Sequence, residues 1–127
     1  MAKILVVDDD PDFVEAARIV LQKHHHEIIS AASGNAGFKR AKEEKPDLII
    51  LDVIMDTLLA GVSVSQRLHN DPELRHIPII MVTSIVHTDY VEFFPTDEDL
   101  HVHVFLSKPV SASQLVQQID RLLAKSQ

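Results

Sequence analysis

Short, largely apolar runs rich in β-branched residues recur along this 127-residue chain. Runs of only four or five residues are typical of parallel strands that are buried on both faces. They lie at Ile4 to Val7, Ile28 to Ala32, Leu48 to Leu51, Ile79 to Val82 and Val102 to Leu106. Because helical patterns separate most of them, the sequence predicts an α/β fold. We expect a doubly wound, five-stranded parallel sheet with helices on both faces.

The first and last predicted helices carry start signals. Asp10 with Pro11 is typical of an N-cap followed by a first-turn proline. Ser111 followed by Gln114 can form a capping box. The buried faces are expected to be Phe13, Ala16, Ala17, Val20 and Leu21 in the first helix, and Leu115, Ile119, Leu122 and Leu123 in the last.

Two more helices are expected between the strands. One runs from Ser33 to Lys45 and is ended by Pro46, although Gly37 lies inside it and weakens the pattern. A shorter helix covers Gly61 to His69 and is closed by a turn at Asn70 to Pro72. Strands and helices therefore alternate throughout, and we expect residues 1–127 to form one domain without an output domain.

Composition excludes several classes of function. The formal charge of −7 would repel a phosphate backbone, so direct nucleic-acid binding is not expected. The three glycines form neither a Walker A loop nor a dinucleotide fingerprint. The chain has no cysteine, and its first apolar run is too short for a secretory or membrane segment. We therefore expect a cytoplasmic protein that does not bind membranes.

Charged residues follow three of the predicted strands. Asp8 and Asp9 come after the first, Asp52 after the third, and Lys108 with Pro109 after the fifth. In an open parallel sheet these positions meet at the carboxyl edge, where ligands bind. Converging carboxylates repel one another and favour a hard dication such as Mg²⁺. We expect Asp9 and Asp52 to bind it directly and Asp8 through water, with Asp52 also able to act as a carboxylate nucleophile toward phosphorus.

These ordered marks, together with Gly61 and Thr83-Ser84, resemble the receiver domain of two-component response regulators, in its stand-alone chemotaxis-type form. The resemblance covers the whole chain and implies a flavodoxin-like sheet of order 2-1-3-4-5. It implies that Asp52 is the phospho-acceptor, and that Mg²⁺ is held by Asp8, Asp9, Asp52 and the main-chain carbonyl of Ile54. Thr83 and Lys108 would contact the phosphoryl oxygens, and Thr83 with Phe105 would form the conformational switch.

The family also implies the partners. A histidine kinase or histidine phosphotransfer protein would donate the phosphoryl group, and the switch would alter contacts with a downstream protein that the sequence does not name. The chain would be a monomer or a phosphorylation-dependent dimer, and it would not be an enzyme acting on outside substrates. An alternative from another class is a pseudo-receiver, an interaction module that works without phosphorylation.

Some positions depart from the family pattern. Asp56 stands where a proline is usual, and the segment before Lys108 is longer than usual. Within that segment we expect a short helix near Thr88 to Phe94, followed by a loop that contains Pro95. The histidine triplet His24 to His26 lies at a helix end, where it can face the negative end of the dipole. His87, His101 and His103 form either a pH-sensitive or metal-binding patch or plain exposed positions.

Overall fold

The computed structural model describes residues 2–52, 60–83, 104–107 and 110–125. Its elements in chain order are β1 (Lys3–Val7), α1 (Pro11–Lys23), β2 (Glu27–Ala31), α2 (Gly34–Glu44), β3 (Leu48–Asp52), α3 (Ala60–Asn70), β4 (Ile79–Thr83), β5 (Val104–Ser107) and α5 (Ala112–Lys125). The strands form one parallel sheet of order β2-β1-β3-β4-β5, which confirms the predicted fold. Ala32 was expected in the second strand but follows its end, and the helix expected near Thr88 to Phe94 lies outside the described residues.

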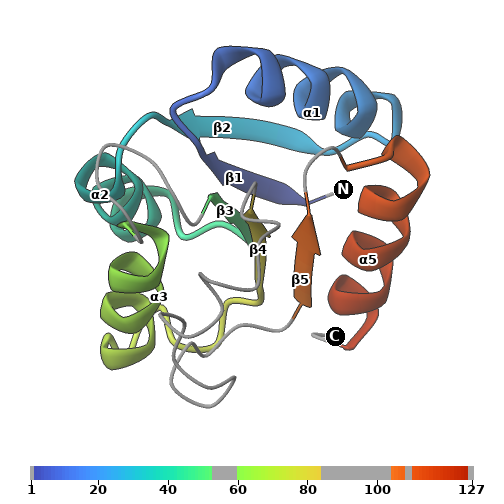
Figure 1. Cartoon of the computed structure of the whole chain (residues 1–127). Helices are drawn as coiled ribbons and strands as arrows, with labels where there is room; N and C mark the ends of the chain where they lie inside the picture. The colour runs from blue at the N-terminus through green and yellow to red at the C-terminus, as the bar shows by residue number, and fades with distance from the viewer. Residues whose placement is uncertain (1, 53–59, 84–103, 108–109, 126–127) are drawn as a thin grey trace.

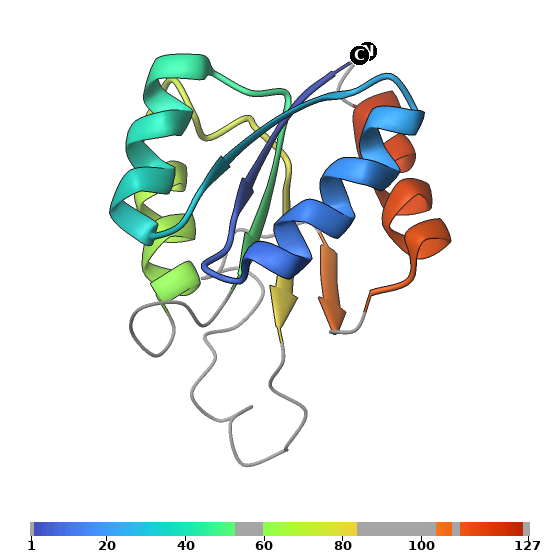
Figure 2. The same cartoon turned by 90° about the horizontal axis from the view of Figure 1, so that it is seen from above.

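Helices cover both faces of the sheet. α1 and α5 lie on one face, and α2 and α3 lie on the other (Figures 1 and 2). Each pair of helices packs against the sheet over a separate apolar core. On the side of α1 and α5 this core includes Ile4, Val6, Leu48 and Ile50. On the side of α2 and α3 it includes Leu5, Val7, Ile49 and Leu51. Adjacent strand residues thus alternate between two cores, which explains why the central strands are apolar throughout.

Strands β1 and β3 are buried on both faces. All side chains from Ile4 to Val7 and from Leu48 to Leu51 are at most 1% exposed. Burying a large aliphatic side chain stabilises a fold by about 1.5–3 kcal/mol. β1 and β3 are therefore firmly held in the sheet, and the residues that follow them are positioned by rigid elements.

The structure corrects one predicted helix face. Asp10 caps α1 by accepting a hydrogen bond from the Asp12 amide, with Pro11 in the first turn, as expected. The buried residues of α1 are Val14, Ala17 and Leu21, whereas Ala16 is exposed. At about 100° per residue, Ala16 lies beside the stripe formed by these three and not within it. In α5 the predicted face holds, with Leu115, Ile119 and Leu122 buried, Leu123 partly buried, and the Ser111 hydroxyl accepting from the Gln114 amide.

Gly37, inside α2, is explained by close packing. A Cβ atom at this position would lie 2.7 Å from Cγ1 and 2.8 Å from Cγ2 of Val7, which is buried in β1. Only a residue without a side chain lets α2 approach the strand this closely. The glycine that weakened the helix pattern therefore allows the α2–β1 contact.

Replacing Gly37 with alanine tests this contact. Helix propensity alone would stabilise α2 by up to about 1 kcal/mol. We expect instead a loss of about 1–3 kcal/mol in the free energy of unfolding, because overpacking against Val7 dominates. In urea unfolding, Gly37→Ala combined with Val7→Ala should lose about 1 kcal/mol less than the sum of the single changes. Simple additivity would contradict the packing explanation.

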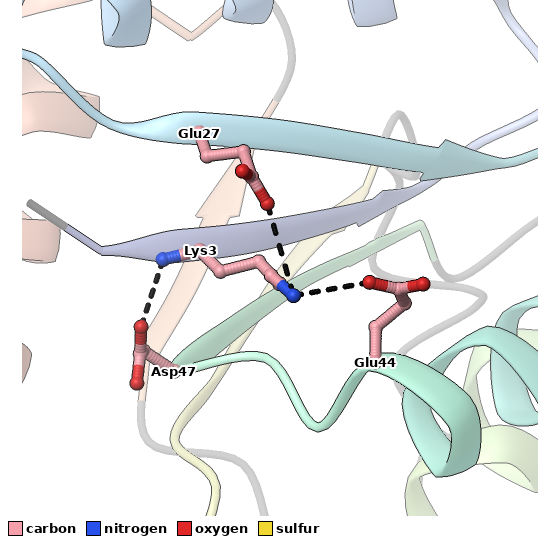
Figure 3. Close-up of polar contacts among 4 residues, drawn as sticks. All are labelled: Lys3, Glu27, Glu44 and Asp47. Carbon is pink, nitrogen blue, oxygen red and sulfur yellow. Dashed lines mark hydrogen bonds and ion pairs between the residues drawn. The ribbon is translucent and has the colours of Figure 1, made fainter.

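At the amino-terminal ends of the strands, polar contacts around Lys3 hold the sheet together (Figure 3). The Lys3 ammonium contacts Glu44 at 3.0 Å and Glu27 at 3.8 Å, while its backbone amide donates to the Asp47 carboxylate at 2.8 Å. These acids come from α2, β2 and the α2–β3 connection. The hydrogen bond to Glu44 is the main reason that the pKa of Lys3 is raised, and it lowers the pKa of Glu44. Lys3 therefore links the start of β1 to three neighbouring segments.

The His26 side chain makes a hydrogen bond that joins the end of the histidine triplet to the start of the chain. Its Nδ1 accepts a hydrogen bond from the Ala2 amide at 3.2 Å, an interaction that requires the neutral ring. Partial burial is the main cause of its lowered pKa, while Asp120 acts in the opposite direction. His24, by contrast, is exposed at the end of α1.

The lowered pKa predicts how stability changes with pH. Unfolding raises the His26 pKa toward its ordinary value of 6.5, so the unfolded chain binds more protons below that pH. The stability linked to neutral His26 is present above pH 6.5 and lost as pH falls toward the folded pKa. In urea unfolding, His26→Asn should flatten this decline, because the Asn amide oxygen accepts from Ala2 without titrating. His24→Asn is the matched control, and an equal effect of both changes would contradict the assignment.

Candidate functional site

The acidic site is built by strand register. β1 pairs with β3 so that Val7 lies opposite Leu51, which places the next residues, Asp8 and Asp52, at the same edge. The Asp8 amide also donates to the Ala31 carbonyl at the end of β2 at 3.0 Å. The first turn of the connection to α1 then presents Asp9. Three carboxylates predicted from separate parts of the sequence are thus brought to one point on the carboxyl edge of the sheet.

One carboxylate oxygen from each of Asp8, Asp9 and Asp52 can be chosen so that the three atoms lie within 4.8 Å of one another. Asp8 is 3% exposed and Asp52 is 5% exposed, whereas Asp9 is open to solvent. Two of the three acids are therefore buried next to the apolar ends of β1 and β3. Like charges at such spacing repel, and burial strengthens the repulsion because less water screens it.

This donor set fits a small hard dication. Mg²⁺ prefers oxygen ligands at about 2.0–2.1 Å in octahedral array and keeps several waters. Carboxylates grouped within 4.8 Å can converge on one such ion, and the exposed side at Asp9 leaves room for water ligands. Among the described residues, this is the one group of three or more acidic or histidine side chains close enough to share an ion.

Asp8 is oriented by a contact that sequence reasoning missed. Its Oδ1 accepts a hydrogen bond from the Asp10 backbone amide at 2.9 Å. Asp10 in turn caps α1 by accepting from the Asp12 amide at 3.0 Å. Asp8 and Asp10 each accept a hydrogen bond from the amide two residues further along the chain, as in an Asx turn. The sequence signal for this contact was the aspartate at positions 8 and 10.

The other predicted site residues are placed in part or not at all. Thr83 ends β4, one residue beyond Val82, which pairs with Asp52, so its backbone lies at the same edge. Phe105 lies in β5, where it pairs with Met81. Lys108 and the Ile54 carbonyl lie outside the described residues, as do Asp56, His87, His101 and His103. The backbone thus brings Thr83 to the acidic edge, and the positions of Lys108 and Ile54 stay predictions.

A groove adjoins the acids between α1 and the end of β2. It has a volume of about 380 Å³. Its walls include Asp8, Asp9, Val14, Arg18 and Ala31. Arg18 is paired with Glu15 across one turn of α1, so the groove wall is charged as well as apolar. The acidic site therefore opens into a groove whose walls carry both charged and apolar side chains.

Comparison with known proteins identifies the family. The response regulator receiver domain model matches residues 4–120. Protein PilH of Pseudomonas aeruginosa is 34% identical over 125 residues, which cover 98% of this chain and 99% of PilH. The polar-differentiation response regulator DivK of Brucella ovis is 28% identical over 94% of each chain. The regulator RpaA of Synechocystis is 29% identical, but this chain spans only 51% of its length.

Solved structures of a response regulator and of a receiver domain have the same fold as this chain. A response regulator from Chloroflexus aurantiacus superposes with a TM-score of 0.85 at 26% identity, covering 97% of this chain and 98% of the other. The receiver domain of a histidine kinase from Syntrophus aciditrophicus gives a TM-score of 0.87 at 26% identity, covering 98% and 92%. The chain belongs to the response regulator receiver family.

Membership defines the general role. Receiver domains are signalling modules of two-component systems that work with kinases or phosphotransfer proteins, and they generally bind Mg²⁺ at an acidic pocket. The cluster of Asp8, Asp9 and Asp52 has the acidic side chains expected of such a pocket. Within the described residues, no helix is both long and apolar enough to cross a membrane.

Crowding of the carboxylates predicts opposite effects of one substitution with and without metal. Asp52→Asn removes one of three like charges while keeping the side-chain shape. In EDTA it should raise the melting temperature, because repulsion is relieved. With Mg²⁺ it should reduce the stabilisation that the wild type gains from ligand binding.

Thermal melts with EDTA and with Mg²⁺ check both effects. Glu43→Gln, on the exposed surface of α2, controls for the loss of one negative charge. If Asp52→Asn behaves like Glu43→Gln in both buffers, the three acids do not form a shared cation site.

Proposed function

We propose that this receiver accepts a phosphoryl group on Asp52 from the phosphohistidine of a histidine kinase or histidine phosphotransfer protein, in a Mg²⁺-dependent reaction. One observation carries the proposal: Asp52 ends a central, fully buried strand and has two further carboxylates within 4.8 Å. Asp52 is thus held by a rigid strand, and its carboxylate lies beside the carboxylates of Asp8 and Asp9, which are typical metal ligands. Family membership supports the same role.

The proposed step is a transfer between two nucleophiles. An Asp52 carboxylate oxygen attacks the phosphorus of the phosphohistidine, and an O–P bond forms as the P–N bond breaks. The electron pair of that bond returns to the ring nitrogen. The imidazole, already protonated on its other nitrogen, then leaves in neutral form. The product is an acyl phosphate on Asp52.

Charge neutralisation is the main demand of this step. Asp8, Asp9, Asp52 and the carbonyl of Ile54 are the proposed holders of the metal, and Lys108 is the proposed contact for a phosphoryl oxygen. The chemistry that Mg²⁺ supplies when bound is neutralisation of the charge on the phosphoryl oxygens. The protein itself holds the three acids at fixed positions, so little reorganisation is needed during the transfer.

The phosphoryl group would then be read by a switch. It brings about −1.5 to −2 charge and strong acceptor oxygens. The Thr83 hydroxyl is the proposed donor to one of these oxygens, and Phe105 is the proposed aromatic residue that follows its movement. Both residues belong to neighbouring strands, β4 and β5, which pair through Thr83 and Ser107. We propose that the resulting change alters contacts with a downstream protein, and that the protein is a cytoplasmic monomer or phosphorylation-dependent dimer in which residues 1–127 of each copy form a receiver domain.

Phosphorylation from a small donor tests the proposal. Intact mass is measured after incubation with phosphoramidate and Mg²⁺. We expect one phosphoryl addition to the wild type, and none after Asp52→Asn or in EDTA. Glu43→Gln, which removes an exposed carboxylate on α2, is the control that should still be phosphorylated.

Two outcomes would overturn the proposal. Modification of the Asp52→Asn variant would place the acceptor elsewhere. No modification of the wild type, together with no Mg²⁺ binding, would favour a pseudo-receiver that works through protein contacts alone.

A further inference from the structure

The Asp8 carboxylate and the start of α1 share one chain of hydrogen bonds. The Asp12 amide donates to Asp10 Oδ1 at 3.0 Å, and the Asp10 amide donates to Asp8 Oδ1 at 2.9 Å. The Asp8 amide donates to the Ala31 carbonyl at 3.0 Å. Each link fixes the direction of the next. The conformation of residue 10 therefore controls one oxygen of a buried carboxylate in the acidic site.

Asp10 itself is not part of the ligand group. Its side chain is exposed, and its carboxylate is absent from the set that lies within 4.8 Å. Its backbone is extended, with φ −94° and ψ 104°, and the side chain bonds the helix at its first turn. Any influence of Asp10 on a bound cation therefore acts without direct ligation, either through the direction of its amide or through its charge at a distance.

We propose that Asp10 is a positioning residue for the metal site: by capping α1 it holds its own amide against Asp8 Oδ1 and so orients Asp8 toward the cation. This inference rests on the proposed function, because it takes the acids to be a Mg²⁺ site. Groups that orient metal ligands without touching the metal typically change affinity by about 10–100-fold when lost.

The mechanism distinguishes three substitutions. Asp10→Ala removes the cap acceptor, which frees the backbone of residue 10 and lets its amide turn away from Asp8. Asp10→Asn and Asp10→Ser keep a good cap acceptor while removing the negative charge. If capping orients Asp8, only the alanine variant should lose affinity. If the charge of Asp10 attracts the cation through space, all three should lose it equally.

A second cap provides the matched control. Ser33 caps α2 by accepting from the Ala36 amide at 3.2 Å, and it carries no carboxylate that could belong to the acidic group. Ser33→Ala should reduce stability about as much as Asp10→Ala, since both remove one N-cap. It should leave Mg²⁺ affinity unchanged, so a general loss of stability is separated from a loss of positioning.

The test is Mg²⁺ binding by isothermal titration calorimetry on the full chain, with each variant first shown to be folded by circular dichroism. We expect Asp10→Ala to raise the Kd about tenfold, at the low end of such effects. Asp10→Asn and Asp10→Ser should stay within about twofold, because both keep the cap. In the wild type, Mg²⁺ should also slow hydrogen exchange at the Asp10 and Asp12 amides, and this slowing should vanish in Asp10→Ala.

Contrary results have separate meanings. If Asp10→Ala binds Mg²⁺ as tightly as Ser33→Ala does, Asp10 does not position Asp8. If Asp10→Asn weakens binding as much as Asp10→Ala does, charge and not capping is responsible, and the proposal is wrong. If the wild type binds no Mg²⁺, the metal site of the proposed function fails with it. Normal wild-type binding and phosphorylation with an unaffected Asp10→Ala would overturn the positioning role alone.

Discussion

The parallel pairing of β1 with β3 is the constraint on which the site depends. Its register sets Val7 opposite Leu51 and thereby makes neighbours of Asp8 and Asp52, which are far apart in sequence. Within the pair itself, all side chains from Ile4 to Val7 and from Leu48 to Leu51 are at most 1% exposed. The hydrophobic energy of the two central strands therefore holds together carboxylates that would otherwise separate by repulsion. A fold stabilised in this way can keep an electrostatically strained site ready for a cation.

Much of this was predictable because it depends on local patterns. The short apolar runs of β1 and β3, the Asp10 cap and the charged strand ends are all visible in the sequence, and parallel topology brings such ends to one edge. Sequence could not predict features that need a partner from another element. Ala16 looked like part of the buried face of α1, but the direction of the helix over the sheet selects Val14 in its place. Gly37 looked like a defect until Val7 was seen to lie against it.

The two ends of the sheet use charge in opposite ways. At the amino edge, Lys3 lies among Glu27, Glu44 and Asp47, so unlike charges join β1 to its neighbours (Figure 3). At the carboxyl edge, the carboxylates of Asp8, Asp9 and Asp52 lie close together and repel one another. The first arrangement stabilises the strands without a ligand, whereas the repulsion in the second would be relieved by a bound cation. The ion pairs and the acidic cluster therefore lie at opposite ends of the same strands.

The convergence of these acids is the basis on which we propose Asp52 as the phospho-acceptor. Borohydride reduces an acyl phosphate to an alcohol, which would turn a phosphorylated aspartate into homoserine and mark the residue permanently. Peptide mapping after phosphorylation with Mg²⁺ and borohydride treatment identifies that residue directly. We expect homoserine at position 52 and nowhere else, and none when EDTA is present. Homoserine at position 8 or 9, or in another part of the chain, would contradict it.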